Sequence, residues 1–267
     1  MSGETANRRS VEETIRANQA AGRGTLIGYL PIGFPTVDAS VEAAIAIVEA
    51  GVDVLELGIP YSDPVMDGPV IQRATTTALA GGVRIADAFD VVHRVTSAVS
   101  APALVMTYYN PVFHHGVERF AQELAAADGA GLITPDLIPD DPEQWIAASE
   151  EAGLERVFLA APSSSDERLG MIAAASRGFV YVVSTMGITG ERAEVDAAAR
   201  KLVSRLRGVA DKPLCVGIGI STPDQVREVN AYADGAIVGS ALVSALAEGG
   251  VAAVADTAAH LAQGKSA

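Results

Sequence analysis

Eight short apolar segments rich in β-branched residues recur along the chain, separated by stretches with helical patterning. They are TLIGYL from Thr25, VDVLELG from Val52, PALVMTYY from Pro102, GLITPD from Gly131, RVFLAAP from Arg156, FVYVVS from Phe179, PLCVGIG from Pro213 and GAIVGS from Gly235. Apolar strands that alternate with helices indicate a parallel sheet covered on its outer face. Eight such units predict a closed (β/α)₈ barrel, the TIM-barrel fold.

The length of 267 residues suits a single barrel domain, because such barrels typically need about 250 residues. We expect one domain over residues 1–267, with residues 1–20 as an extension and the barrel over residues 21–263. The extension should hold an additional helix from Arg9 to Ala20. The wide gap after the second strand supplies another extra helix, in GPVIQRATTTALAGG, before the regular helix in RIADAFDVVHRVTSAV.

Helical periodicity and capping signals support the predicted helices. Apolar residues at i, i+3 and i+7 predict one buried stripe at Val117, Phe120 and Leu124 and a longer one at Val195, Leu202, Leu206 and Val209. Residue pairs typical of helix starts occur at Asp141–Pro142 and Thr222–Pro223, and glycines typical of helix ends at Gly51, Gly129 and Gly153.

The chain is strongly acidic, with a formal net charge of −14. This charge opposes nucleic acid and anionic membrane surfaces, so neither is an expected partner. A phosphorylated substrate would need helix N-termini and backbone amides to overcome the repulsion. The single cysteine, Cys215, predicts a buried thiol in a reducing compartment. No secretory leader and no apolar run approaching 18 residues are visible, so we expect a soluble cytoplasmic protein.

Polar residues at the carboxyl ends of the strands are the first candidates for chemistry in such a barrel. Glu56, within VLELGIP, should have its pKa raised by burial toward a value useful for proton transfer. Pairing with a lysine or arginine inside the barrel is the alternative reading. Asp67 lies eleven positions later in PYSDPVMDGP and can bring a second carboxylate over the same site. A simple turn role remains open for Asp67 and for Asp63.

Glycine-rich segments after the last two strands point to a phosphate site. VGIGIST leads to a helix near Thr222, and IVGSALV places Gly239 and Ser240 at another helix start. Tight turns alone would also explain these glycines. The segment STMGITG, from Ser184 to Gly190, is either a mobile lid or an ordinary loop. Histidine spacing gives little support for a metal site, and Trp145 and Phe120 read as packing residues.

The string LELGIPYSDPVMDGP closely resembles the signature of the tryptophan synthase alpha chain family. The likeness extends through GYLPIGFP, MTYYNPV, TPDLIP, FVYVVSTMGITG, VGIGIST and GAIVGSALV, and so covers nearly the whole chain. The resemblance implies a carbon–carbon lyase that cleaves indole-3-glycerol phosphate to indole and glyceraldehyde 3-phosphate. It also implies an α₂β₂ complex with a beta chain, a role in tryptophan biosynthesis, and no need for a metal or organic cofactor.

The resemblance also assigns residues. Glu56 and Asp67 match the catalytic carboxylates of the family, and Asp63 and Asn110 match positions near the beta chain. The positions that match substrate-binding residues are Tyr29, Met106, Tyr181, Thr189, Gly190, Gly219, Gly239 and Ser240. Among these, Tyr29 and Met106 match the indole pocket, Tyr181 a tyrosine near the glutamate, Thr189 a lid residue, and the last four the phosphate site.

Three departures from the family pattern leave the catalytic groups in place. Met66 stands where alanine is frequent, Phe34 replaces the aspartate of a common Gly-Asp-Pro, and Thr185 with Met186 replaces a stretch that often holds an arginine. They put in doubt how the lid closes and how it communicates with the partner.

Two other functions remain as alternatives at this point. One is another phosphate-binding barrel enzyme, such as a phosphosugar isomerase or an aldolase. A Schiff-base aldolase would need a lysine at a strand end, and Lys212 precedes its strand at the opposite end. The other alternative is a non-catalytic subunit that binds a phosphorylated ligand and activates a partner.

Overall fold

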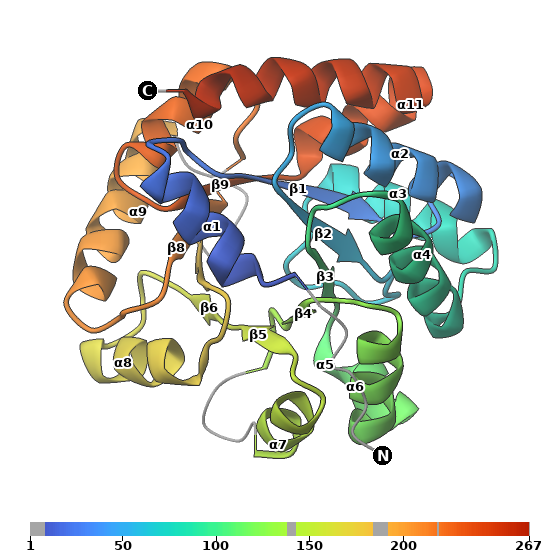
Figure 1. The fold of residues 1–267 in the computed structure, drawn as a ribbon, viewed down its shortest axis with the longest axis horizontal. Helices are drawn as coiled ribbons and strands as arrows, with labels where there is room; N and C mark the ends of the chain where they lie inside the picture. Colours follow the sequence, from blue (N-terminus) through green and yellow to red (C-terminus); the bar gives the residue numbers. More distant parts are fainter. Residues whose placement is uncertain (1–8, 138–142, 184–191, 218, 267) are drawn as a thin grey trace.

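The computed structural model describes residues 9–137, 143–183, 192–217 and 219–266, with the side chains of residues 192–195 also left out. Within these ranges the strands form one parallel sheet in the order β5-β4-β3-β2-β1-β9-β8-β7-β6. Figure 1 shows the strands as an inner ring with helices around it. The predicted TIM barrel is confirmed.

Each of the eight predicted apolar segments contains a strand. The strands are β1 (Leu26–Pro31), β2 (Val54–Gly58), β3 (Ala103–Met106), β4 (Gly131–Ile133), β5 (Glu155–Val157), β6 (Leu159–Ala160), β7 (Val180–Val183), β8 (Leu214–Gly217) and β9 (Gly235–Val238). The count is nine because the fifth segment is interrupted at Phe158. Its first half pairs with β4 and its second half with β7, so this one segment closes the ring.

The helices cover the outside of the ring and its two ends. They are α1 (Val11–Ala20), α2 (Val37–Glu49), α3 (Pro69–Ala80), α4 (Ile85–Ala98), α5 (Tyr109–His115), α6 (Val117–Ala126), α7 (Glu143–Glu151), α8 (Asp166–Ala175), α9 (Arg192–Arg207), α10 (Pro223–Asn230) and α11 (Ser240–Ala262), with a 3₁₀ turn at Gln263–Lys265. Both predicted extra helices are present, as α1 and α3.

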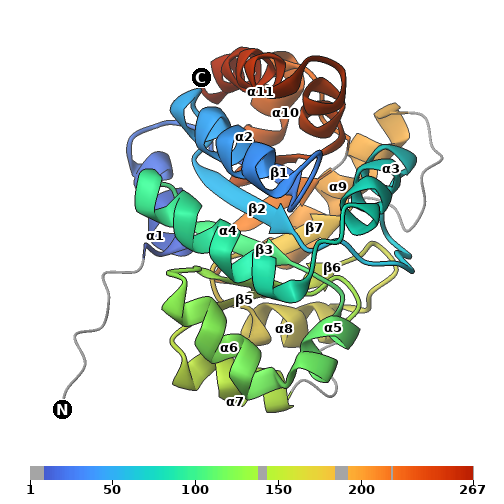
Figure 2. The ribbon, with the colours of Figure 1, turned by 90° about the vertical axis from the view of Figure 1, so that its right-hand side faces the viewer.

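The amino end of the barrel is closed by α1, which lies across the ring in Figure 1 and opposite α3 in Figure 2. Its Val11 and Ile15 are fully buried against strand residues that include Val54 and Phe179. Glu155 on β5 fixes the start of α1, because its carboxylate accepts the Ser10 hydroxyl at 2.8 Å and the Val11 amide at 2.9 Å. The carboxyl end is therefore the end left for a site.

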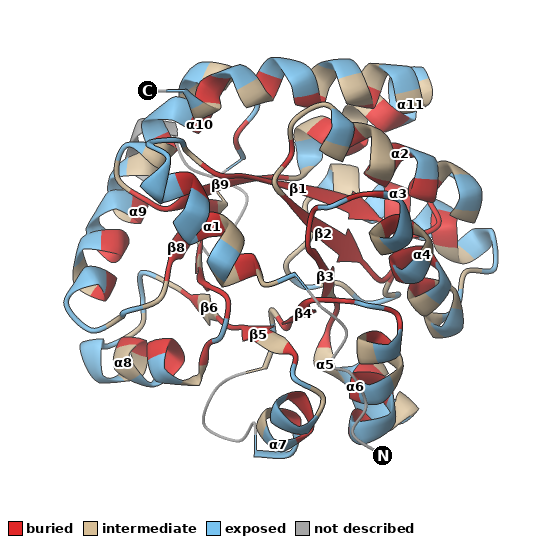
Figure 3. Ribbon diagram, viewed as in Figure 1, coloured by how far each residue is buried: buried red, intermediate tan, exposed pale blue. Residues whose placement is uncertain are grey.

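The strands are the most deeply buried part of the chain, as Figure 3 shows. The residues of β1, β2 and β9 are buried without exception. In an eight-stranded barrel, side chains fill the interior and leave no pore. Cys215 on β8 is a fully buried free thiol, as the sequence predicted.

The region from Ser240 to Lys265 is long and apolar enough to cross a membrane by length and composition alone. Its helix is interrupted at Gly250, whose φ of 68° is not helical. Leu242, Val243 and Leu246 are buried on one face, and α11 packs against α2 and β1. We interpret it as a covering helix of the barrel.

Some local predictions were wrong. The third strand was expected to run to Tyr109 but ends at Met106, and Tyr108 then becomes the N-cap of the short helix α5. Val209 was expected in a buried stripe, but it lies beyond the end of α9 and is 47% exposed. Leu202 and Leu206 of that stripe are buried, and the side chain of Val195 lies outside the described residues.

The other helix signals are confirmed where the structure describes them. Val117, Phe120 and Leu124 form the buried stripe of α6, and Trp145 is fully buried. Thr222 caps α10 with Pro223 in its first turn. Gly51 and Gly153 have the positive φ typical of helix ends, and Gly129 follows α6. The predicted Asp141–Pro142 start lies outside the described residues.

Candidate active site

Glu56 lies on β2 and is 1% exposed. Its register partners are Tyr29 on β1 and Leu104 on β3. Within the described residues, one of its carboxylate oxygens is buried without a hydrogen-bond partner, and no ion pair to a lysine or arginine forms. The sequence alternative of a buried structural ion pair is therefore not what the described part of the barrel shows.

This environment favours the protonated form of Glu56. Burial raises its pKa from 4.5 to about 8, and the negative charge of Asp67 acts in the same direction. A carboxyl group with a pKa in this range can both give and take a proton near neutral pH. Burial therefore shifts the pKa of Glu56 in the direction that sequence analysis expected.

Asp67 lies on the loop between β2 and α3 and is half-buried. Burial raises its pKa, and a hydrogen bond from the Tyr108 hydroxyl opposes this change. The same hydroxyl accepts the backbone N–H of Met66 at 2.9 Å. The charge of Asp67 raises the pKa of Glu56, so the loop brings the second carboxylate near the first.

Two tyrosines share the interior with these carboxylates. An added Cβ at Gly58 would lie 2.7 Å from the ring of Tyr29, and one at Gly217 would lie 2.7 Å from the Tyr181 hydroxyl. Glycine at both positions leaves room for each tyrosine ring beside the neighbouring strand. Burial raises the pKa of both tyrosines, and the charges of Asp67 and Glu56 add to the effect. Both hydroxyls therefore stay protonated beside the carboxylates.

The N-terminus of α11 carries the stronger phosphate-binding features of the two glycine-rich turns. Gly239 is its N-cap and provides no side-chain cap, so the first amide groups of the helix have no side-chain acceptor there. Ser240, the first helical residue, is exposed. A Cβ added at Gly239 would lie 3.5 Å from the Tyr29 ring, so this glycine is close to that side chain. Among the described residues, no side chain of the N-cap covers the start of α11.

The turn after β8 is different. Gly219 has a φ of 70°, which favours glycine, but α10 is capped by its own residues. The Thr222 hydroxyl accepts the Gln225 amide, and the Gln225 side chain accepts the amides of Ser221 and Thr222 at 2.8 and 3.2 Å. The amides at this helix start are already engaged, a difference that the two similar glycine motifs did not reveal.

The remaining predicted residues lie at the same end of the barrel where they are described. Met106 ends β3 in register with Gly58. Asp63 and Asn110 are exposed, and the Asn110 amide donates to the Tyr61 hydroxyl at 3.3 Å. Thr189 and Gly190 lie outside the described residues. No cluster of His, Cys, Asp or Glu suited to a metal occurs among the described side chains.

Tyr108 is a site residue that sequence analysis missed. It is 5% exposed, contacts the Asp67 loop, and stacks on Tyr61 with ring centroids 5.0 Å apart. The signal was present, since Tyr108 is a polar residue just after a strand. It was hidden because the run PALVMTYY was read as one continuous strand.

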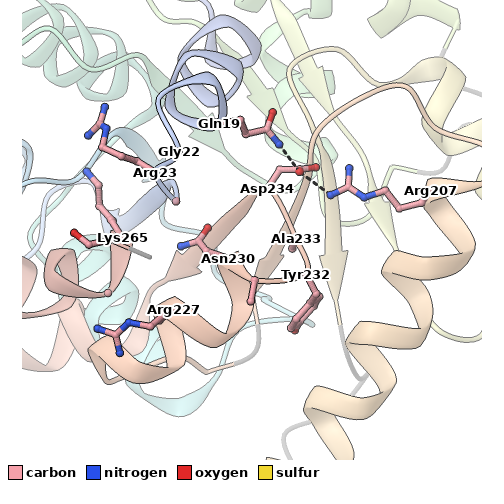
Figure 4. A pocket seen from close by; sticks show the side chains of 14 residues that line it. Gln19, Gly22, Arg23, Arg207, Arg227, Asn230, Tyr232, Ala233, Asp234 and Lys265 are labelled. Carbon is pink, nitrogen blue, oxygen red and sulfur yellow. Dashed lines mark hydrogen bonds and ion pairs between the residues drawn. The ribbon is translucent and has the colours of Figure 1, made fainter.

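A hollow of about 470 Å³ lies at the opposite, amino end of the barrel, and Figure 4 shows its cationic lining. Arg207 pairs with buried Asp234 at 2.6 Å, Arg227 with Asp224, and Lys265 with Asp53 at 2.7 Å. The C-terminal ends of α1 and α10 also meet there, and cations stabilise such helix ends. We interpret these charges as structural.

Comparisons with known proteins agree with this geometry. Residues 15–266 match the family model described as tryptophan synthase alpha chain. The tryptophan synthase alpha chain of Leifsonia xyli subsp. xyli is 63% identical over 254 residues, which cover 95% of this chain and 97% of the relative. The one from Mycobacterium marinum is 58% identical and covers 86% of each chain.

Solved structures give the same result. A structure of Mycobacterium tuberculosis tryptophan synthase is 51% identical, with a TM-score of 0.92 over 99% of this chain and 100% of that one. A tryptophan synthase complex from Pyrococcus furiosus is 34% identical, with a TM-score of 0.81 over 90% and 98% of the two chains. With this sequence, this fold and these paired carboxylates, the chain belongs to the tryptophan synthase alpha chain family.

Proposed function

We propose that Glu56 and Asp67 catalyse the reaction of this family, the retro-aldol cleavage of indole-3-glycerol phosphate to indole and glyceraldehyde 3-phosphate in tryptophan biosynthesis. The observation that carries the proposal is the buried carboxyl group of Glu56, one oxygen of which has no hydrogen-bond partner among the described residues and whose pKa burial raises to about 8. A group with this pKa suits a reaction in which one residue first donates a proton and then accepts one.

Glu56 protonates C3 of the indole ring, because neutral indole is a poor leaving carbanion. The resulting carboxylate takes the proton from the side-chain hydroxyl next to the breaking bond. The carbon–carbon bond then breaks, its electron pair returns to the ring, and an aldehyde forms from the hydroxyl carbon. Glu56 ends the cycle protonated, as it began.

Asp67 acts as a carboxylate that accepts a hydrogen bond from the indole N–H. It stabilises the positive charge that develops on the ring when C3 is protonated. The hydrogen bond from Tyr108 lowers the pKa of Asp67 against the effect of burial and so supports this ionised role. Tyr29, Met106 and Tyr181 form the walls around the indole.

The open amides at the start of α11, with Gly239 and Ser240, bind the phosphate and orient the substrate. Gly219, Thr189 and Gly190 complete this part of the site in the proposal, as the resemblance implies. The substrate is thereby held by its phosphate while the ring lies between the carboxylates.

The partner of the family is a beta chain, and we propose an α₂β₂ assembly. Asp63, exposed Phe113 on α5 and Asn110 lie on the side of the site where the beta chain would dock. A hollow of about 470 Å³ near Asp63 is lined by Tyr61, Pro64 and Leu79 among others. We further propose one cytoplasmic barrel domain over the whole chain, with no nucleic-acid or membrane partner.

The test is an assay of indole release from indole-3-glycerol phosphate, with and without a beta chain. Asp67→Asn should lower turnover nearly as far as Glu56→Gln, and substrate should still bind. Turnover within about tenfold of the wild type for either variant would contradict the assigned roles. If the wild-type chain released no indole but activated the beta chain, it would be a regulatory subunit instead.

A further inference from the structure

The loop that carries Asp67 is held by the first residues of α5. The Tyr108 hydroxyl contacts both the Met66 amide and the Asp67 carboxylate. The ring of Tyr108 stacks on Tyr61, and the Asn110 amide donates to the Tyr61 hydroxyl. These contacts tie the loop after β2 to the segment after β3.

The start of α5 is in turn held from the loop after β4. Tyr108 is the N-cap of this helix and makes no side-chain cap of its own. Both oxygens of Asp136 accept the backbone N–H of Tyr109, at 2.9 and 3.2 Å. An Asp136 carboxylate at this position also interacts favourably with the helix dipole.

We propose that Asp136 is a positioning residue for the catalytic carboxylate Asp67 and acts on it through Tyr108. Asp136 fixes the backbone of Tyr109, the adjacent Tyr108 then directs its hydroxyl at Asp67, and that hydroxyl holds Asp67 in place. Asp136 itself is exposed. The inference rests on the proposed role of Asp67 in the reaction.

The electrostatics of Tyr108 fit this chain of contacts. Burial raises the pKa of Tyr108, the Met66 amide opposes this change, and the charges of Asp67 and Asp136 reinforce it. The phenol therefore keeps its proton and remains a donor. Because its hydrogen bond lowers the pKa of Asp67, losing it would raise that pKa and leave less ionised Asp67 at low pH.

The experiment measures kcat and KM for indole release against pH for the full chain with its beta chain. The variants are Tyr108→Phe, Asp136→Ala, Asp136→Asn and the double variant Tyr108→Phe/Asp136→Ala. Asp90→Ala, at an exposed position of α4, is the matched control for loss of a surface aspartate. Tyr108→Phe keeps the aromatic ring, and thermal unfolding confirms that each variant is folded.

We expect Tyr108→Phe to lower kcat about tenfold and Asp136→Ala to lower it roughly three- to fivefold. In both variants, the acid limb of the plot of kcat against pH should move to higher pH. Asp136→Asn, which retains one acceptor oxygen, should lie between Asp136→Ala and the wild type. The double variant should be no worse than Tyr108→Phe, because residues that act through one another are not additive.

If the loss of kcat in the double variant equalled the product of the losses in the two single variants, the proposal would be overturned, because the two residues would then act independently. A lower kcat in Asp136→Ala with an unmoved acid limb would also overturn it. Asp67→Asn separates this inference from the proposed function. If Asp67→Asn is inactive while Asp136→Ala keeps wild-type activity, only the positioning role of Asp136 is contradicted. If Asp67→Asn remains active, the catalytic role of Asp67 itself is contradicted.

Discussion

The two ends of the barrel both bury carboxylates, but they surround them differently. At the amino end, Glu155 accepts the Ser10 hydroxyl and two amides of α1, and Asp234 accepts the Leu214 amide and pairs with Arg207. At the carboxyl end, one oxygen of Glu56 has no partner among the described residues. Burial raises the pKa of Glu155 as well, but its donors oppose the change.

The difference separates a structural carboxylate from a reactive one. Hydrogen-bond donors stabilise the charged form of Glu155, so its charge holds α1 in place. Among the described residues, one oxygen of Glu56 has no such donor, and Asp67 adds a like charge nearby. The same residue type therefore serves stability at one end of the barrel and, in the proposed reaction, proton transfer at the other, where such barrels carry their active sites.

The largest effect should come from Glu56→Gln. This change keeps the shape of the side chain but removes the proton that the reaction transfers. We expect indole release to fall by more than about a thousandfold with substrate binding retained. Steady-state assays and binding titrations measure this. Near wild-type turnover would place the proton transfer on another group.

The stability of the same variant should depend on pH. The folded chain keeps the Glu56 proton up to about pH 8, whereas the unfolded chain releases it near pH 4.5. Wild-type stability therefore falls as pH rises through this window, while glutamine does not titrate.

Glu56→Gln should thus gain stability over the wild type between these pH values, by on the order of a few kcal/mol, and the gain should level off above about pH 8. Denaturant unfolding at several pH values measures it. A difference that stays constant with pH would show that the pKa of Glu56 is not raised.

Glu155→Gln makes the matched change at the amino end. It should leave turnover unchanged and lower the free energy of unfolding by about 1 kcal/mol, because α1 loses part of its N-terminal cap. Unfolding curves and the indole assay on one preparation check both expectations. Lost turnover with an unchanged free energy of unfolding would contradict the structural role assigned to Glu155.

The smallest expected effect is that of a chelator. The proposed steps use only side-chain carboxylates and backbone amides, so EDTA should leave the rate of indole release unchanged. Metal-free buffer with and without added Mg²⁺ provides the control. Inhibition by EDTA that Mg²⁺ reverses would require a metal in the mechanism.

The sequence was sufficient to predict the architecture, because barrel strands are apolar and regularly spaced. All eight segments contain strands, and both extra helices form. The errors are at boundaries. Tyr108 was predicted to lie in a strand, because aromatic residues favour strands, but a helix starts there, and its Tyr109 amide donates to the Asp136 carboxylate.

The candidate site could be predicted only in part. The position of Glu56 at a strand end follows from the fold, but its lack of a partner depends on every side chain around it. The role of Asp67 depends on Tyr108, which is 41 positions later in the chain, and such a contact leaves no local pattern. The two glycine motifs looked alike, but the side-chain caps from Thr222 and Gln225 distinguish α10 from α11.

The most direct test of this account is a titration of Glu56 itself. It is monitored by NMR of the carboxyl carbon in a protein labelled at its glutamates, and the Glu56→Gln variant assigns the signal. The account predicts that this carboxyl group titrates near pH 8 and that the alkaline limb of kcat follows it. Titration near pH 4.5, the ordinary value for glutamate, would contradict the claim that an unpaired buried carboxyl group at this end of the barrel carries the reaction.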